Sequence, residues 1–131
     1  MKIKQIVAVL CLALSTTAFA DQEGVMFNVV LLKDGKIVAS PGVVGEFGKE
    51  VTVEITQTFK VVGLASVPDA EGHSLTAVRL SLFENGAMQP LKEMSMLADL
   101  TKTPSFEYSV PGTTYRFVVR PRQVKLPEAK G

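Results

Sequence analysis

The chain has 131 residues, of which 47% are hydrophobic and 21% are charged, and its formal net charge is +1. These values fit one folded domain and exclude wholesale disorder. A net charge so close to zero provides no long-range field for nucleic acid, so a nucleic-acid partner is not expected.

Residues 1–20 have the pattern of a secretory signal peptide. Lys2 and Lys4 precede the apolar run 6–14, and Ala18-Phe19-Ala20 supplies small residues at the cleavage position. We expect cleavage after residue 20 and export to the periplasm or the exterior. The apolar run is too short to span a bilayer, so the mature chain is expected to have no transmembrane segment. The only cysteine, Cys11, lies in this leader, which predicts a disulfide-free mature protein.

Most of the remaining hydrophobic residues alternate with polar ones, which is the period of a half-buried β-strand. The alternation is clearest in residues 51–56, 78–83, 106–110 and 115–120, and Pro121 is expected to end the last segment. Residues 91–100 fit a helical stripe as well as a strand, and we favour a strand.

Dipeptides with turn-forming chemistry separate these segments. Asp34-Gly35 and Asn85-Gly86 predict tight hairpins, because such turns require positive φ angles. Pro90 predicts that the strand after the second hairpin is short or lies at an edge. Pro111-Gly112 favours a four-residue loop, and the glycines at every third position of 42–48 predict a bent link between strands.

Together these patterns predict an all-β fold. We expect a single β-sandwich domain of about seven to eight mostly antiparallel strands over residues 21–124. The following residues, 125–131, have little to bury and are expected to form a flexible tail.

The most site-like feature is a row of basic side chains near the C-terminus. Arg116, Arg120 and Arg122 share one parity, so a strand continuing past Pro121 would present them on one face, extended by Lys125. Two interpretations stay open. Glu107 opposite the row makes it an ordinary solvated face, whereas free arginines would recognise an acidic partner, a glycan or a lipid headgroup.

Asp69, Glu71 and His73 stand at alternate positions of a polar loop and form the one set with metal-ligand chemistry. The same residues also fit a solvated turn around Gly72, and we expect no metal and no cofactor. The mature chain has no cysteine, and its only histidine has no Gly-x-Ser-x-Gly motif to place a nucleophile beside it. The sequence therefore predicts a protein that is not an enzyme.

The order of these elements, Asp34-Gly35 through Pro41, then 51–53 and finally 115–119, resembles small exported β-sandwich proteins of Gram-negative bacteria whose function is unassigned. The resemblance implies an envelope location and a non-catalytic role. We expect a binding or adaptor protein for another envelope component, which acts through a sheet face or an unpaired edge near Gly42 or Pro90. The alternatives are a small-ligand module with an aromatic or arginine-lined cleft, and a hydrolase or metal-dependent enzyme.

Overall fold

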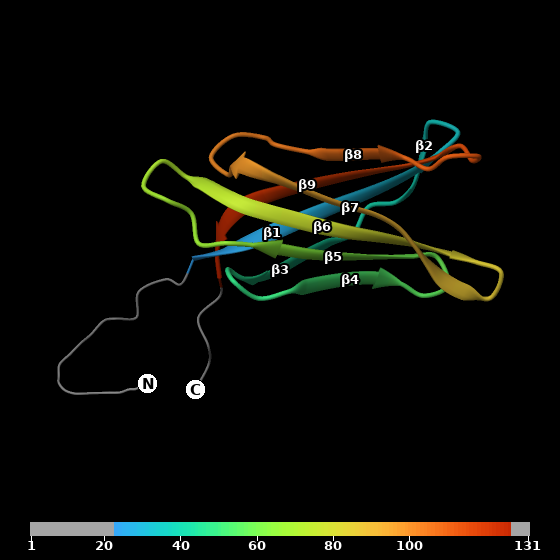
Figure 1. The fold of residues 1–131 in the computed structure, drawn as a ribbon, viewed down its shortest axis with the longest axis horizontal. Helices are drawn as coiled ribbons and strands as arrows, with labels where there is room; N and C mark the ends of the chain where they lie inside the picture. Colours follow the sequence, from blue (N-terminus) through green and yellow to red (C-terminus); the bar gives the residue numbers. More distant parts are fainter. Residues whose placement is uncertain (1–22, 127–131) are drawn as a thin grey trace.

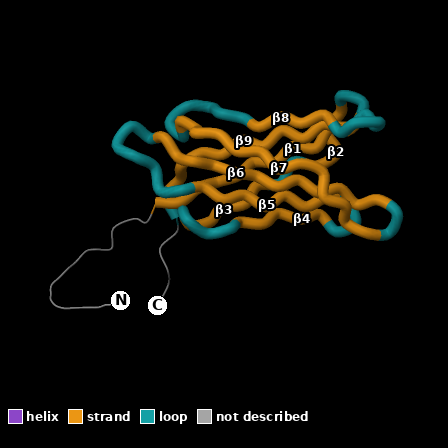
Figure 2. Tube along the Cα trace, viewed as in Figure 1, coloured by secondary structure: helices purple, strands orange, loops and turns teal. Residues whose placement is uncertain are grey.

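The structure is a computed structural model that describes residues 23–126, and these residues form nine strands and no helix (Figures 1 and 2). The strands are β1 (Glu23–Lys33), β2 (Lys36–Ala39), β3 (Gly42–Glu46), β4 (Val51–Ile55), β5 (Phe59–Ala65), β6 (His73–Glu84), β7 (Ala87–Asp99), β8 (Phe106–Ser109) and β9 (Tyr115–Lys125). The all-β prediction is confirmed, with one strand more than expected. The predicted signal peptide, 1–20, and most of the predicted tail lie outside the described residues.

The strands form two antiparallel sheets, an arrangement consistent with a β-sandwich (Figure 1). The five-stranded sheet has the order β2-β1-β9-β8, with β3 also paired to β1, and the four-stranded sheet has the order β4-β5-β6-β7. Strand β1 pairs with β9 along its whole length, so the first and last strands are neighbours. Strands β2 and β3 follow one another along the opposite side of β1.

Both predicted tight hairpins are present. Asp34 and Gly35 have φ values of 54° and 77°, and Asn85 and Gly86 have 53° and 81°, which are the positive angles of a two-residue hairpin turn. The third hairpin has the predicted four-residue loop, because the Val110 N–H donates to the Tyr115 carbonyl at 2.9 Å.

The expectation for Pro90 is confirmed, whereas that for Pro121 is wrong. The strand containing Pro90 is an edge strand as expected, but it is long, and a register shift between its partners Leu80 and Ser81 leaves Leu91 as a bulge. The chain remains extended beyond this bulge, so the strand assignment of residues 91–99 is confirmed.

Pro121 does not end β9, and the direction of the backbone explains why. The Tyr115 carbonyl accepts from Val110 on the β8 side, so alternation turns the backbone groups of Pro121 to the same side. Pairing between β8 and β9 stops at Val119. The missing N–H of Pro121 therefore lies where no strand requires a donor.

The glycine-rich stretch is also more regular than predicted, because it forms strand β3 rather than a bent link. Glycine is required here by close approach. A methyl group at Gly45 would overlap the Val51 side chain, at the point where β3 of one sheet lies beside β4 of the other.

Three phenylalanines occupy the centre of the core between the sheets. Phe27 and Phe117 come from the five-stranded sheet and Phe59 from the four-stranded sheet, and all three are fully buried. The rings of Phe59 and Phe117 meet edge to face at 5.6 Å. Gly63 on β5 makes room for Phe27, since a methyl group there would lie 2.6 Å from the Cζ atom of Phe27.

We expect Gly63→Ala to lower the free energy of unfolding by about 1–3 kcal/mol, because the added methyl group forces the packed Phe27 ring to move. Urea denaturation of residues 21–131 measures this change. Phe27→Leu in the same chain frees space beside the methyl group, so the double variant should lose less than the sum of the two single variants. Additive losses would contradict the proposed overlap.

Candidate functional site

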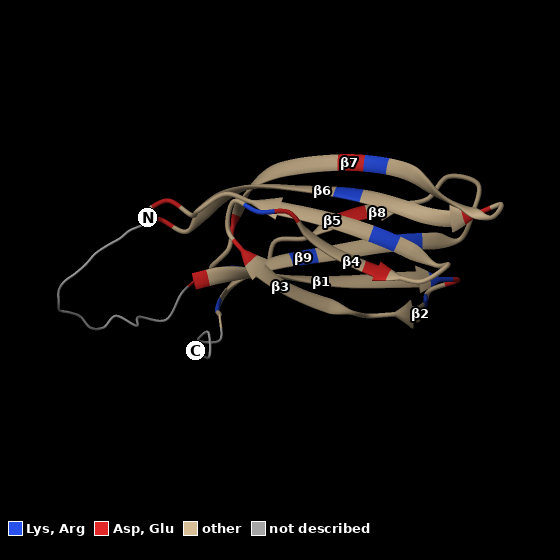
Figure 3. Ribbon diagram, turned by 90° about the horizontal axis from the view of Figure 1, so that it is seen from below, with Lys and Arg blue, Asp and Glu red and all other residues tan. Residues whose placement is uncertain are grey.

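Strand β9 places the three predicted arginines on the outer face of the five-stranded sheet. Tyr115, Phe117 and Val119 point inward, and alternation turns Arg116, Arg120 and Arg122 outward, where all three are exposed. Figure 3 shows basic positions on this strand. Val118 lies between them on the same face, yet it is only 5% exposed.

Arg116 is neutralised by a neighbour. Its Nη2 atom donates to Oε1 of Glu107 on β8, two residues away from Ser109, which lies directly opposite Arg116. The sequence predicted Glu107 as a partner of the arginine row, and among the described ion pairs it contacts Arg116 and not Arg120. Both side chains are about half exposed, so the pair contributes little to stability.

Arg120 and Arg122 have a different environment. Their direct partners on β1 are Asn28 and Met26, and Nη2 of Arg122 lies 3.4 Å from the Met26 sulfur. Among the described residues, the ion pairs include neither arginine. The sheet therefore presents two adjacent guanidinium groups without a carboxylate.

Lys125 does not continue this row. It is an odd number of residues from Arg122, so alternation directs it to the other face of β9. In the strand register it lies opposite Glu23, at the end of the β1–β9 ladder. The basic row thus consists of arginines alone.

The candidate metal-ligand set lies in the loop that leads into β6 of the four-stranded sheet. Its three ligand atoms, from Asp69, Glu71 and His73, all lie within 4.8 Å of one another. Nδ1 of His73 is 3.7 Å from Oδ1 of Asp69 and 3.8 Å from Oε1 of Glu71. One nitrogen and two oxygen ligands suit zinc and similar divalent ions chemically.

Asp69 already has a structural role in this loop. Its Oδ1 atom accepts the backbone N–H groups of Glu71 and His73 at 2.9 and 3.0 Å. The His73 N–H, followed by that of Glu71, lowers the pKa of the Asp69 carboxyl. The hydroxyl and then the N–H of Thr101 likewise lower the pKa of the neighbouring Asp99.

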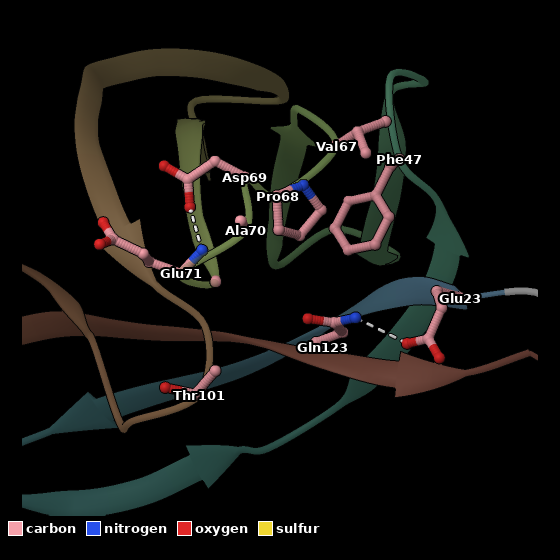
Figure 4. A pocket seen from close by; sticks show the side chains of 10 residues that line it. Glu23, Phe47, Val67, Pro68, Asp69, Ala70, Glu71, Thr101 and Gln123 are labelled. Atoms are coloured by element: carbon pink, nitrogen blue, oxygen red, sulfur yellow. Dashed lines mark hydrogen bonds between the residues drawn. The ribbon is translucent and has the colours of Figure 1, made fainter.

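A pocket of about 450 Å³ adjoins this loop (Figure 4). Phe47, Val67 and Pro68 provide apolar walls, while Glu23 and Gln123, which hydrogen-bond to each other at 2.6 Å, lie on the opposite side. A smaller pocket of about 300 Å³ at the β8–β9 loop is lined by both Tyr115 and Arg116. Neither of these two pockets contains Arg120 or Arg122.

The chain matches no protein-family model, no curated protein and no solved structure. Among the described residues, no helix is long and apolar enough to cross a membrane. The site must therefore be interpreted from its own chemistry.

Sequence reasoning missed Met26 and Asn28, because only the pairing of β1 with β9 brings them beside the arginines.

The lowered pKa values predict how Asp69 and Asp99 respond to acid. Each stabilises the fold above the ordinary aspartate pKa of 3.8 and loses that contribution as the pH falls through its lower folded value. We expect Asp69→Asn with Asp99→Asn to flatten the loss of stability below about pH 4, as measured by urea midpoints across acidic pH.

Asp34→Asn is the matched control for this prediction. It removes a carboxylate from the β1–β2 turn but preserves the turn chemistry as Asn-Gly, so it should keep the steep acid dependence of the parent. Equal acid dependence in the double variant and the parent would contradict the role assigned to the two aspartates.

Proposed function

We propose that this chain is an exported, non-catalytic binding protein that recognises an acidic surface of another protein in the cell envelope. The observation that carries the proposal is the pair Arg120 and Arg122. They stand side by side on the outer face of the five-stranded sheet, and neither takes part in an ion pair with a described residue. Carboxylates of a partner would supply the missing planar, bidentate contacts.

The side chains around the arginines favour a protein as the partner. The neighbouring outward positions hold Met26, Val30, Val44 and the shielded Val118. Arginine and methionine are enriched at protein interfaces, whereas lysine is depleted. A surface that uses arginine among apolar residues supports recognition of a shaped protein surface.

The non-catalytic part of the proposal rests on the chemistry of the site residues. Arginine, methionine and asparagine on an open sheet face include no nucleophile paired with a base. The only histidine, His73, belongs to the other sheet and lies beside carboxylates rather than a hydroxyl.

Export is the part of the proposal that is simplest to test. If the signal peptide is removed as its pattern predicts, the protein from the envelope or culture fraction should begin at Asp21. Intact-mass measurement of the fractionated protein determines this terminus. A chain that retains residues 1–20 and stays with the cytoplasmic fraction would contradict export.

Removal of Arg120 and Arg122 should weaken partner capture. We expect Arg120→Ala with Arg122→Ala to weaken binding by about tenfold or more, because arginines at the centre of an interface contribute strongly to affinity. The measurement is affinity capture of tagged residues 21–131 from crosslinked envelope extract, followed by titration of the identified partner.

Arg79→Ala provides the matched control. Arg79 is also an exposed arginine, but it belongs to the four-stranded sheet and forms an ion pair with Glu50 at 3.2 Å. It should retain full binding. If capture yields no protein while native mass spectrometry of the purified chain reveals a bound small molecule, the small-ligand alternative at the Tyr115 and Arg116 pocket replaces this proposal.

A further inference from the structure

The free edge of β7 presents a row of backbone groups that no described strand uses. Strand β7 is the last strand of the four-stranded sheet. The Leu100 N–H donates to Gly72 at 2.9 Å, so alternation directs the even-numbered residues of β7 toward β6. The backbone groups of Glu93, Ser95 and Leu97 therefore point away from the sheet.

This open row has defined limits at both ends. The Leu91 bulge interrupts the strand on one side, and the neighbouring Pro90 has no N–H to offer. On the other side, the Asp99 carbonyl accepts the Lys102 N–H at 3.1 Å in the turn that leaves the strand. The regular open edge thus extends from residue 92 to residue 98, which is enough for one added strand of seven residues.

The two faces of this edge have different chemistry. Met94 and Met96 point inward and are half-buried against the core. On the outer face, Leu97 is 66% exposed and lies opposite Leu75, which is 62% exposed. Glu93 is exposed on the same outer face and lies directly opposite Arg79 of β6, whose ion pair among the described residues is with Glu50.

We propose that the β7 edge binds an extended strand of a partner protein by β-augmentation. The complementary strand carries apolar residues opposite Met94 and Met96, an apolar residue opposite Leu97, and a lysine or arginine opposite Glu93. Cross-strand pairs of this kind give an added strand its register, while the backbone groups hold it. The proposal concerns the opposite sheet from Arg120 and Arg122 and does not depend on that site.

Charge complementarity favours a foreign strand over a second copy of this chain. In a symmetric antiparallel pair of two β7 edges, a residue whose backbone groups point away from its own sheet must lie opposite another such residue. Depending on register, Glu93 then faces Ser95, Leu97, Asp99 or the other Glu93. Lys92 belongs to the opposite face, so no such register places a basic residue of the second copy opposite Glu93, whose basic neighbour in its own sheet is Arg79.

A peptide of the stated pattern tests the proposal directly. The probe is the blocked heptapeptide Thr-Val-Leu-Thr-Leu-Lys-Thr, which in antiparallel register places its valine opposite Leu97 and its lysine opposite Glu93. Titration into isotope-labelled residues 21–131 should shift amide resonances of residues 92–98 above all others. Replacing the peptide lysine with glutamate should weaken binding about threefold to tenfold.

Two variants of the protein separate edge binding from other causes. Ser95→Pro removes an outward N–H without breaking a bond to β6, so it should abolish binding while the fold persists. Ser109→Pro removes an outward N–H from β8, the edge of the other sheet, and should leave binding unchanged. Glu93→Lys should reverse the preference between the lysine and glutamate peptides, and it does not require a new proline to be tolerated.

Peptide binding that shifts the resonances of residues 92–98, with a charge preference that Glu93→Lys reverses, would support the proposal. Absence of shifts at millimolar peptide, or shifts that persist in Ser95→Pro, would overturn the proposal. A dimer of the parent that Ser95→Pro converts to a monomer without peptide would assign the edge to a second copy instead. None of these results affects capture through the arginines, so the two proposals fail separately.

Discussion

The register of the β1–β9 ladder determines where every other feature of the five-stranded sheet lies. It joins the first and last strands over the full length of β1. In this register Phe27 and Phe117 face the core, while Met26 and Arg122 face outward as a pair. A shift by one residue would exchange the two faces. The core and the arginine surface are therefore two consequences of one alignment.

The free arginines impose only a modest cost on this alignment. Alternate residues of a strand are separated by roughly 7 Å, at which two like charges repel by about 0.6 kcal/mol in water. The ion pair with Glu107 offsets the charge of Arg116, whereas the residue opposite Arg120 is Asn28 and not a carboxylate. The folded chain tolerates such repulsion alone, and a bound carboxylate would remove it. The uncompensated charge thus has little effect on the stability of the fold, which is compatible with the binding role proposed for this surface.

Features that depend on local residues could be predicted from the sequence, whereas features that depend on pairing between distant strands could not. Asp34-Gly35 and Asn85-Gly86 identified their hairpins because the turn geometry depends on those residues alone. The continuation of β9 through Pro121 depends on where β8 ends, and the residues beside the arginines depend on β1. Neither follows from local patterns. Strand alternation alone would have placed Lys125 on the face opposite to the arginines. The approach of Asp69 to His73, in contrast, depends on the turn at Gly72, whose φ is 86°.

Strand β7 differs from the other edge strands in its length. Strands β2 and β8 have four residues each, and β3 and β4 have five. Such short edges offer few backbone groups to a foreign chain. Strand β7 has thirteen residues, and its proline and bulge blunt only the first half. Its second half combines unused backbone groups with exposed Leu97, which are the properties that favour pairing with another strand. The fold thus limits pairing at its short edges, and among the described strands it leaves residues 92–98 of β7 open, as the proposed β-augmentation requires.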